Sequence, residues 1–222
     1  MMSIFYESIS KDISVMMRHR AEWVQSLVFF IVFISLFGIG LGFDNQMLMS
    51  ISPAIIWIAF LLTSLFTIES IFRREMESGT LEQLALSPHP LWWLLLAKAA
   101  ALWLVSCLPL ILLLPILSMF MQLDIAQTGV FVLCLLLGSP AITLLGMIGV
   151  LLTLSMPRSG LFLGIILLPL YVPVLILGES AVVLLFESTL PIFQMTLLAA
   201  ISVLTLTLAP HGAAGALSVA MD

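Results

Sequence analysis

Long apolar stretches alternate with short polar ones along most of the chain. Six apolar segments can be separated in this way, and each approaches or exceeds the roughly 20 residues that a bilayer-spanning helix needs. They lie near residues 23–43, 50–72, 91–121, 129–155, 161–178 and 190–209. The pattern predicts an all-α integral membrane protein with six transmembrane helices in a single membrane domain, residues 1–222.

The residues before the first apolar segment, 1–22, have the pattern of an amphipathic helix. The apolar positions of the helix are Phe5, Ile9, Ile13 and Met16, and the polar ones are Glu7, Lys11, Ser14 and Arg18. A helix of this kind next to a span is expected to lie in the membrane interface, as an elbow before the first span. A helix that packs on a partner protein is the alternative.

The connection between the second and third segments predicts an extension of the second helix. Glu69 and Arg73, like Arg73 and Glu77, are four residues apart, which allows ion pairs on one face of a helix. Gly79 suits the left-handed conformation in which helices often stop.

Residues 79–90 predict a second, short helix after this stop. Thr80 and Gln83 have the spacing of a capping box, and Pro88 and Pro90 would end the helix. Its apolar positions, Leu81, Leu84 and Ala85, share one face, whereas Glu82 and Gln83 point elsewhere. A short helix held in this way can pass force from a partner to the spans. A tight reversal with a capped turn is the alternative.

The spans contain residues that permit kinks and close helix approach. Pro109, Pro115 and Pro140 lie inside apolar segments, and Gly138, Gly146 and Gly149 form a small-residue face. We interpret that face as helix packing.

Basic residues are confined to one side of the predicted map. The joins at 44–49, 122–128 and 178–189 contain no Lys or Arg, while all seven basic residues lie near the N-terminus or the other joins. By the positive-inside rule, both termini are predicted to be cytoplasmic.

Composition then excludes several classes of protein. Hydrophobic residues make up 62% of the 222 residues and charged residues only 9%, against roughly a quarter in soluble domains. A basic nucleic-acid-binding surface is not expected. No span carries a His-Glu-x-x-His motif or a Ser with a His or Lys base, so the chain is predicted to be non-catalytic. An ion-coupled transporter would need ionisable groups in mid-membrane, and the predicted span centres are bare.

The second connection resembles a pattern found in ABC exporter permeases. The pattern Glu-x-x-x-Gly-Thr-Leu-Glu, here Glu75 to Glu82, marks in those proteins the coupling helix that docks on the ATPase. Further similar stretches are Pro53 to Trp57, Leu81 to Pro90, Leu96 to Lys98, Leu136 to Gly149, Leu163 to Pro173 and Leu208 to Ala216. Together they resemble the heme exporter protein B (CcmB) family, the permease subunits of the cytochrome c maturation ABC transporter.

The resemblance implies an ABC exporter permease half in the bacterial inner membrane, in contact with lipid. It would bind a second copy of itself, the ATPase subunit CcmA, and CcmC and CcmD. ATP hydrolysis in CcmA would be linked to release of the heme-loaded periplasmic chaperone CcmE. The coupling residues it implies are Glu75, Gly79, Thr80, Leu81, Glu82, Gln83 and Leu84. A non-transporting scaffold, or an exporter permease for another hydrophobic substrate, are the alternatives.

We expect no cofactor or metal bound directly to this chain. His19, His89 and His211 all fall on the predicted cytoplasmic side, and the external joins offer only Met47 and Met49 as axial heme ligands. Cys107 and Cys134 lie in apolar runs, as buried thiols do. Heme would then be handled by the complex, at the tryptophan-rich site of CcmC that the resemblance implies, and ATP by the partner subunit.

Overall fold

The computed structural model describes residues 2–18, 20–41, 45–121, 123–153, 159–186 and 189–220. Within these ranges the structure is helical and contains no strand, which confirms the all-α class. The helices are α1 (Met2–Arg18), α2 (Arg20–Gly40), α3 (Asn45–Glu77), α4 (Thr80–Ala85), α5 (Leu91–Leu102), α6 (Leu108–Phe120), α7 (Ile125–Thr153), α8 (Ser159–Phe186) and α9 (Ile192–Ala220). A π-helical turn, Trp103–Cys107, joins α5 to α6.

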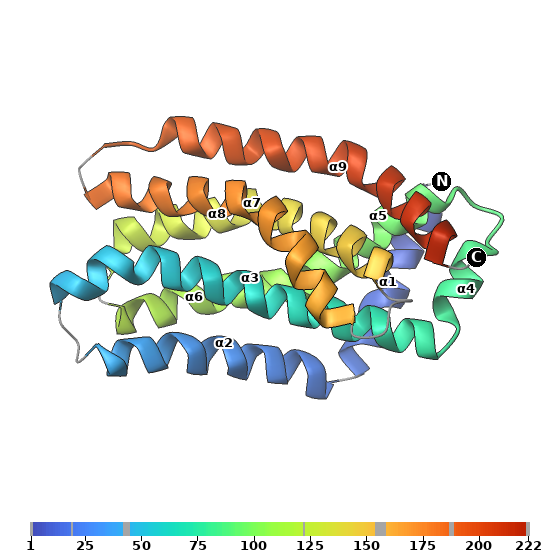
Figure 1. Cartoon of the computed structure of the whole chain (residues 1–222), viewed down its shortest axis with the longest axis horizontal. Helices are drawn as coiled ribbons and strands as arrows, with labels where there is room; N and C mark the ends of the chain where they lie inside the picture. The colour runs from blue at the N-terminus through green and yellow to red at the C-terminus, as the bar shows by residue number, and fades with distance from the viewer. Residues whose placement is uncertain are drawn as a thin grey trace.

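The long helices lie side by side in one elongated bundle (Figure 1). Helices α1 and α4 gather at one end of the bundle, together with the start of α5 and both chain termini. We call this end the α4 end.

Five stretches of the described helices are long and apolar enough to cross a membrane. They are Ser50–Glu77, Leu91–Phe120, Ile125–Thr153, Ile165–Leu185 and Ile192–Val219. The first predicted span corresponds to α2, whose apolar part, Val24–Gly40, is shorter. The structure therefore supports a multi-pass membrane protein, while the count of six spans stays a prediction.

Two helices continue beyond the ends that their polarity pattern predicts. Helix α8 passes Gly178 and runs to Phe186, because the single acidic residue Glu179 is tolerated inside an otherwise apolar helix. Helix α9 continues through the small residues after Pro210 to Ala220. Helix α3 extends to Glu77 as predicted, and Arg73 pairs with Glu69 at 2.6 Å on its surface.

The small-residue face of α7 is confirmed as a packing face. A Cβ atom added at Gly146 would lie 2.7 Å from the Tyr171 hydroxyl, and one at Gly149 would lie 2.6 Å from Leu167, both on α8. Tyr171 donates a hydrogen bond to the carbonyl of Ile142 on α7 at 3.1 Å. Helices α7 and α8 thus approach closely where side chains are missing.

The π-helical turn has a local cause in Pro109. A proline has no N–H to donate to the carbonyl four residues earlier, which is that of Val105 in this turn. A π-bulge is one way for a helix to accommodate such a residue. The third apolar segment is therefore one long span, α5 to α6, with an irregular turn inside it.

The amphipathic pattern of α1 is confirmed, but its apolar face packs on the chain itself. Helix α1 contacts α5, and the rings of Phe5 and Trp93 lie 5.0 Å apart between centroids. Met16 is buried and Ile13 packs against the core, while the polar positions are exposed: Glu7, Lys11, Ser14 and Arg18. The face predicted for the membrane interface is therefore largely covered by α5.

Candidate coupling site

The turn between α3 and α4 is sharp, and backbone hydrogen bonds hold it to the end of α3. Gly79 has φ of 70°, so the predicted left-handed stop is confirmed. The amides of Ser78 and Gly79 donate to the carbonyls of Arg74 and Met76 at 2.9 and 3.1 Å. Helix α4 thereby leaves α3 at the α4 end of the bundle and runs towards the start of α5 (Figure 1).

The predicted capping box is wrong. Gly79, not Thr80, is the N-cap of α4, and no side chain caps the helix. The amide of Gln83 donates to the Gly79 carbonyl at 3.2 Å, so it is not available to the hydroxyl of Thr80. That hydroxyl lies 2.8 Å from the Ser78 hydroxyl instead, where the pair links the two sides of the turn.

The seven coupling residues divide into outward and inward sets. Glu82 and Gln83 are exposed, whereas Gly79, Thr80 and Leu84 are half-buried. Leu81 is buried in the core with 4% of its surface exposed, and the Glu75 side chain is 12% exposed. The apolar face of α4 is thus the side by which this short helix packs on its own chain.

Sequence reasoning missed Leu86, which follows α4 and is 83% exposed. Its amide donates to the carbonyl of Glu82 at 3.0 Å, so the two residues lie one helical turn apart on the outer side. The spacing in the sequence could have indicated this exposure, because Leu86 is five residues from Leu81 and cannot share its face of the helix.

A buried lysine near α4 was also missed. Lys98 of α5 is 1% exposed, and its Nζ lies 2.6 Å from Glu75 Oε1 on α3 and 3.5 Å from Asp12 Oδ2 on α1. From its pattern, Lys98 was assigned only to the basic residues near the joins and to the similar stretch Leu96 to Lys98. A lone lysine in the apolar helix α5 needs a carboxylate partner, but nothing in the pattern identifies a partner 23 residues away.

A polar cavity of about 620 Å³ adjoins this cluster. Side chains from α1, α3, α4 and α5 line it, including Lys11, Asp12, Arg74, Glu75, Gln83 and Lys98. The inner side of α4 therefore borders this cavity as well as packed side chains.

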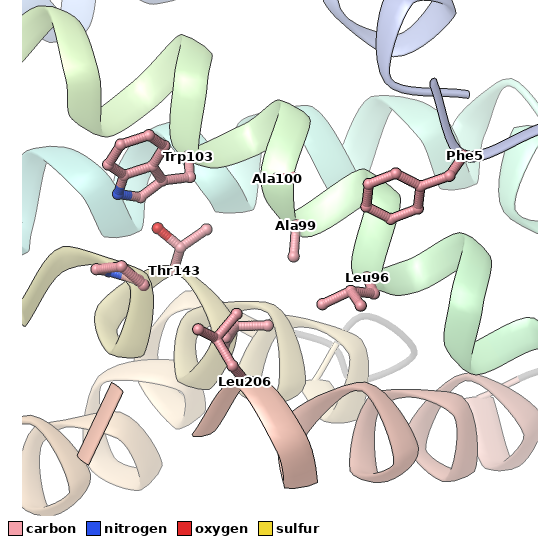
Figure 2. Close-up of a pocket in the computed structure, with 9 residues that line it drawn as sticks. Phe5, Leu96, Ala99, Ala100, Trp103, Thr143 and Leu206 are labelled. Carbon is pink, nitrogen blue, oxygen red and sulfur yellow. The ribbon is translucent and has the colours of Figure 1, made fainter. Parts of the chain in front are cut away.

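A second, apolar cavity of about 340 Å³ lies between α5, α7 and α9 (Figure 2). Leu96 and Ala99 of α5, Thr143 of α7 and Leu206 of α9 line it, and Phe5 of α1 lies at one end. Trp103 also borders the cavity, and its Nε1 donates to the Ser139 hydroxyl at 2.8 Å. A lining with so few polar atoms suits an aliphatic group rather than a charged one.

Candidate heme and metal ligands are dispersed where the structure describes them. His89 is exposed, and the exposed His211 ring stacks on Trp92 with centroids 5.2 Å apart. Across the described residues, no three His, Cys, Asp or Glu side chains come together as a metal site. Cys107 and Cys134 are buried thiols, as predicted. The prediction about His19, Met47 and Met49 concerns side chains outside the described part.

Comparison with known proteins covers nearly the whole chain. Residues 3–220 match the family described as CcmB protein. Heme exporter protein B of Pseudomonas aeruginosa is 38% identical over 221 residues, which is 100% of this chain and 99% of the relative. The Haemophilus influenzae protein of that name is 38% identical over 219 residues, 99% of each chain. The Paracoccus denitrificans one is 38% identical over 209 residues, 94% of this chain and 96% of the relative. The chain belongs to the CcmB protein family.

Proposed function

We propose that this chain is the permease subunit of an ABC transporter complex that acts in cytochrome c maturation in the bacterial inner membrane. Its relatives carry the name heme exporter protein B and match it from end to end. In this proposal the chain spans the membrane six times, with α2 as the first span, and is itself non-catalytic. Heme is handled by the complex rather than held by this subunit.

The α4 end is the cytoplasmic side in this proposal. Both termini, α1 and α4 lie at that end (Figure 1). Lys11 and Arg18 lie on α1, Arg73 and Arg74 lie near the end of α3, and Lys98 lies on α5, the start of which is at that end. This distribution supports the orientation given by the positive-inside rule.

The observation that carries the proposal is the exposed outer side of α4. Leu86 is 83% exposed and is flanked by the exposed polar residues Glu82 and Gln83. An apolar residue inside a polar rim is the usual composition of a protein-binding site. We infer that the ATPase subunit, CcmA, docks on this side, so that ATP hydrolysis moves α4 and drives release of heme-loaded CcmE.

The remaining partners fit the lateral surface of the bundle. Helices α8 and α9 carry exposed apolar side chains along their length, among them Ile165, Leu168, Ile176, Phe193, Val203 and Leu208. In the proposed complex this surface contacts lipid, a second copy of the chain, or CcmC and CcmD.

Co-purification of the tagged chain from membranes tests the docking proposal. Leu86→Asp should release the ATPase subunit, or stop it from supporting maturation of c-type cytochromes, without lowering the amount of chain in the membrane. Tyr6→Asp is the control, because Tyr6 is a 75% exposed residue of α1 and lies outside the candidate spans. Full ATPase binding and maturation in both Leu86→Asp and Glu82→Arg would contradict docking at α4 and favour a scaffold role.

A further inference from the structure

The charge cluster of Lys98, Glu75 and Asp12 joins three helices beside α4. Lys98 belongs to α5, Glu75 to the last turn of α3, and Asp12 to α1. The side chains are 2%, 12% and 21% exposed, so the ammonium group is almost completely removed from solvent. The ring of Phe72 lies 6.0 Å from Nζ and closes another side.

Because these charged side chains are buried, the positions of the helices that carry them depend on one another. A charge taken out of water is tolerated only where an opposite charge and hydrogen bonds compensate it. Lys98 compensates Glu75 Oε1, while the other oxygen, Oε2, is buried and accepts no hydrogen bond from a described residue. Moving the end of α3 away from α5 would therefore leave the Glu75 carboxylate without its cation and Lys98 with only the longer contact to Asp12.

Glu75 is in turn bonded to the start of α4. The Ser78 hydroxyl donates to the Glu75 carbonyl at 3.2 Å and lies 2.8 Å from the hydroxyl of Thr80, the first residue of α4. A set of polar contacts therefore runs from Thr80 through Ser78 to the backbone carbonyl of Glu75, whose side chain in turn pairs with Lys98. It ends on α5, which begins the span Leu91–Phe120.

We propose that Lys98 is a positioning residue for coupling, which fixes the turn that carries α4, and α1 with it, to the membrane helix α5. A displacement of α4 then moves α5 instead of being lost by bending at the turn. This inference rests on the proposed function, in which the ATPase docks on α4. Glu75, which the family pattern places among the docking residues, acts from inside by pairing with Lys98.

A role in coupling can be distinguished from a role in stability alone by the quantity that decreases when the cluster is removed. If the cluster only stabilises the fold, its loss lowers the amount of chain and of complex, and maturation falls in proportion. If it transmits movement, the complex assembles and hydrolyses ATP, but each hydrolysis event supports less maturation.

The test compares the whole complex with wild-type chain, Lys98→Met and Lys98→Arg. Four quantities are measured: bound ATPase subunit, ATP turnover, yield of c-type cytochrome, and the unfolding temperature in detergent. We expect Lys98→Met to keep the ATPase subunit and lose about tenfold in cytochrome yield per ATP hydrolysed. Lys98→Arg, which keeps the positive charge, should recover most of that ratio.

Three results would overturn the proposal. The first is a wild-type ratio in Lys98→Met. The second is a Lys98→Arg variant no better than Lys98→Met although both are assembled. The third applies if Lys98→Met is degraded, and it uses Asp12→Asn, which keeps the 2.6 Å pair between Lys98 and Glu75. This variant should then lower the cytochrome yield per ATP with the complex intact. An unchanged yield per ATP overturns the proposal. Failure of the proposed function is seen separately, as absence of the ATPase subunit from the wild-type chain.

Discussion

Leu81 and Leu86 offer a direct test of which side of α4 faces a partner. They are the same residue type five positions apart, and Leu81 is 4% exposed while Leu86 is 83% exposed. The family pattern places Leu81 among the docking residues, but the structure places it in the core. Replacing each by aspartate should therefore give opposite results.

The magnitudes follow from burial. Leu81→Asp gives up about 1.5–3 kcal/mol of apolar burial. It also places a carboxylate where no partner is built for it, which adds at least about 1–3 kcal/mol. The sum, roughly 3–6 kcal/mol, is a large share of the 5–15 kcal/mol by which proteins are usually stable. Leu86→Asp changes an exposed residue and should cost less than about 0.5 kcal/mol.

The assay separates stability from docking. The unfolding temperature and membrane level of the chain are measured with and without its ATPase subunit, for both variants. We expect Leu81→Asp to lower both quantities in the chain alone. Leu86→Asp should leave them unchanged and lose only the ATPase subunit. A stable Leu81→Asp chain, or a Leu86→Asp chain that binds the ATPase normally, would refute the assignment of inner and outer sides.

Two more substitutions test the geometry. Gly79→Val places a β-branched residue at φ of 70°, a strain of about 1–3 kcal/mol at the base of α4; maturation should fall while the membrane level stays near wild type, and equal maturation would argue against a helix break there. Gly149→Ala places a Cβ atom 2.6 Å from Leu167 and should destabilise the chain by about 1–3 kcal/mol in thermal unfolding. Gly215→Ala, at a helical glycine with nothing within 4 Å of the added atom, is its control and should be neutral or stabilising.

Sequence periodicity predicted the elements better than their ends. The lengths of the apolar runs predicted the helices, because a bilayer span needs a long run of apolar residues and such a run can be read directly from the sequence. The end of α8 was predicted too early, because Glu179 was interpreted as part of a connection between two spans. The Gly79 stop was found because its cause is local, since glycine adopts positive φ at little cost.

The candidate site could be predicted only in part, because its decisive contacts are distant in sequence. Spacing placed Leu81 and Leu84 on one face of α4 but did not say whether that face turned inward. The capping box was predicted wrongly, since the pattern cannot show that the Gln83 amide already donates to the Gly79 carbonyl. The pair between Lys98 and Glu75 required the fold itself.

In the proposed complex, the two sides of α4 let one short motif serve both docking and coupling. A partner that pushes on Leu86 and Glu82 acts on a helix of six residues, which is too short to hold its own direction. That direction is set by Leu81 in the core and by the Gly79 turn, which is bonded to Glu75 and through it to Lys98. In this proposal the outward residues determine which partner binds, and the inward residues determine whether that binding moves α5. Variants of the first kind should lose the partner, whereas variants of the second kind should keep the partner and lose its effect.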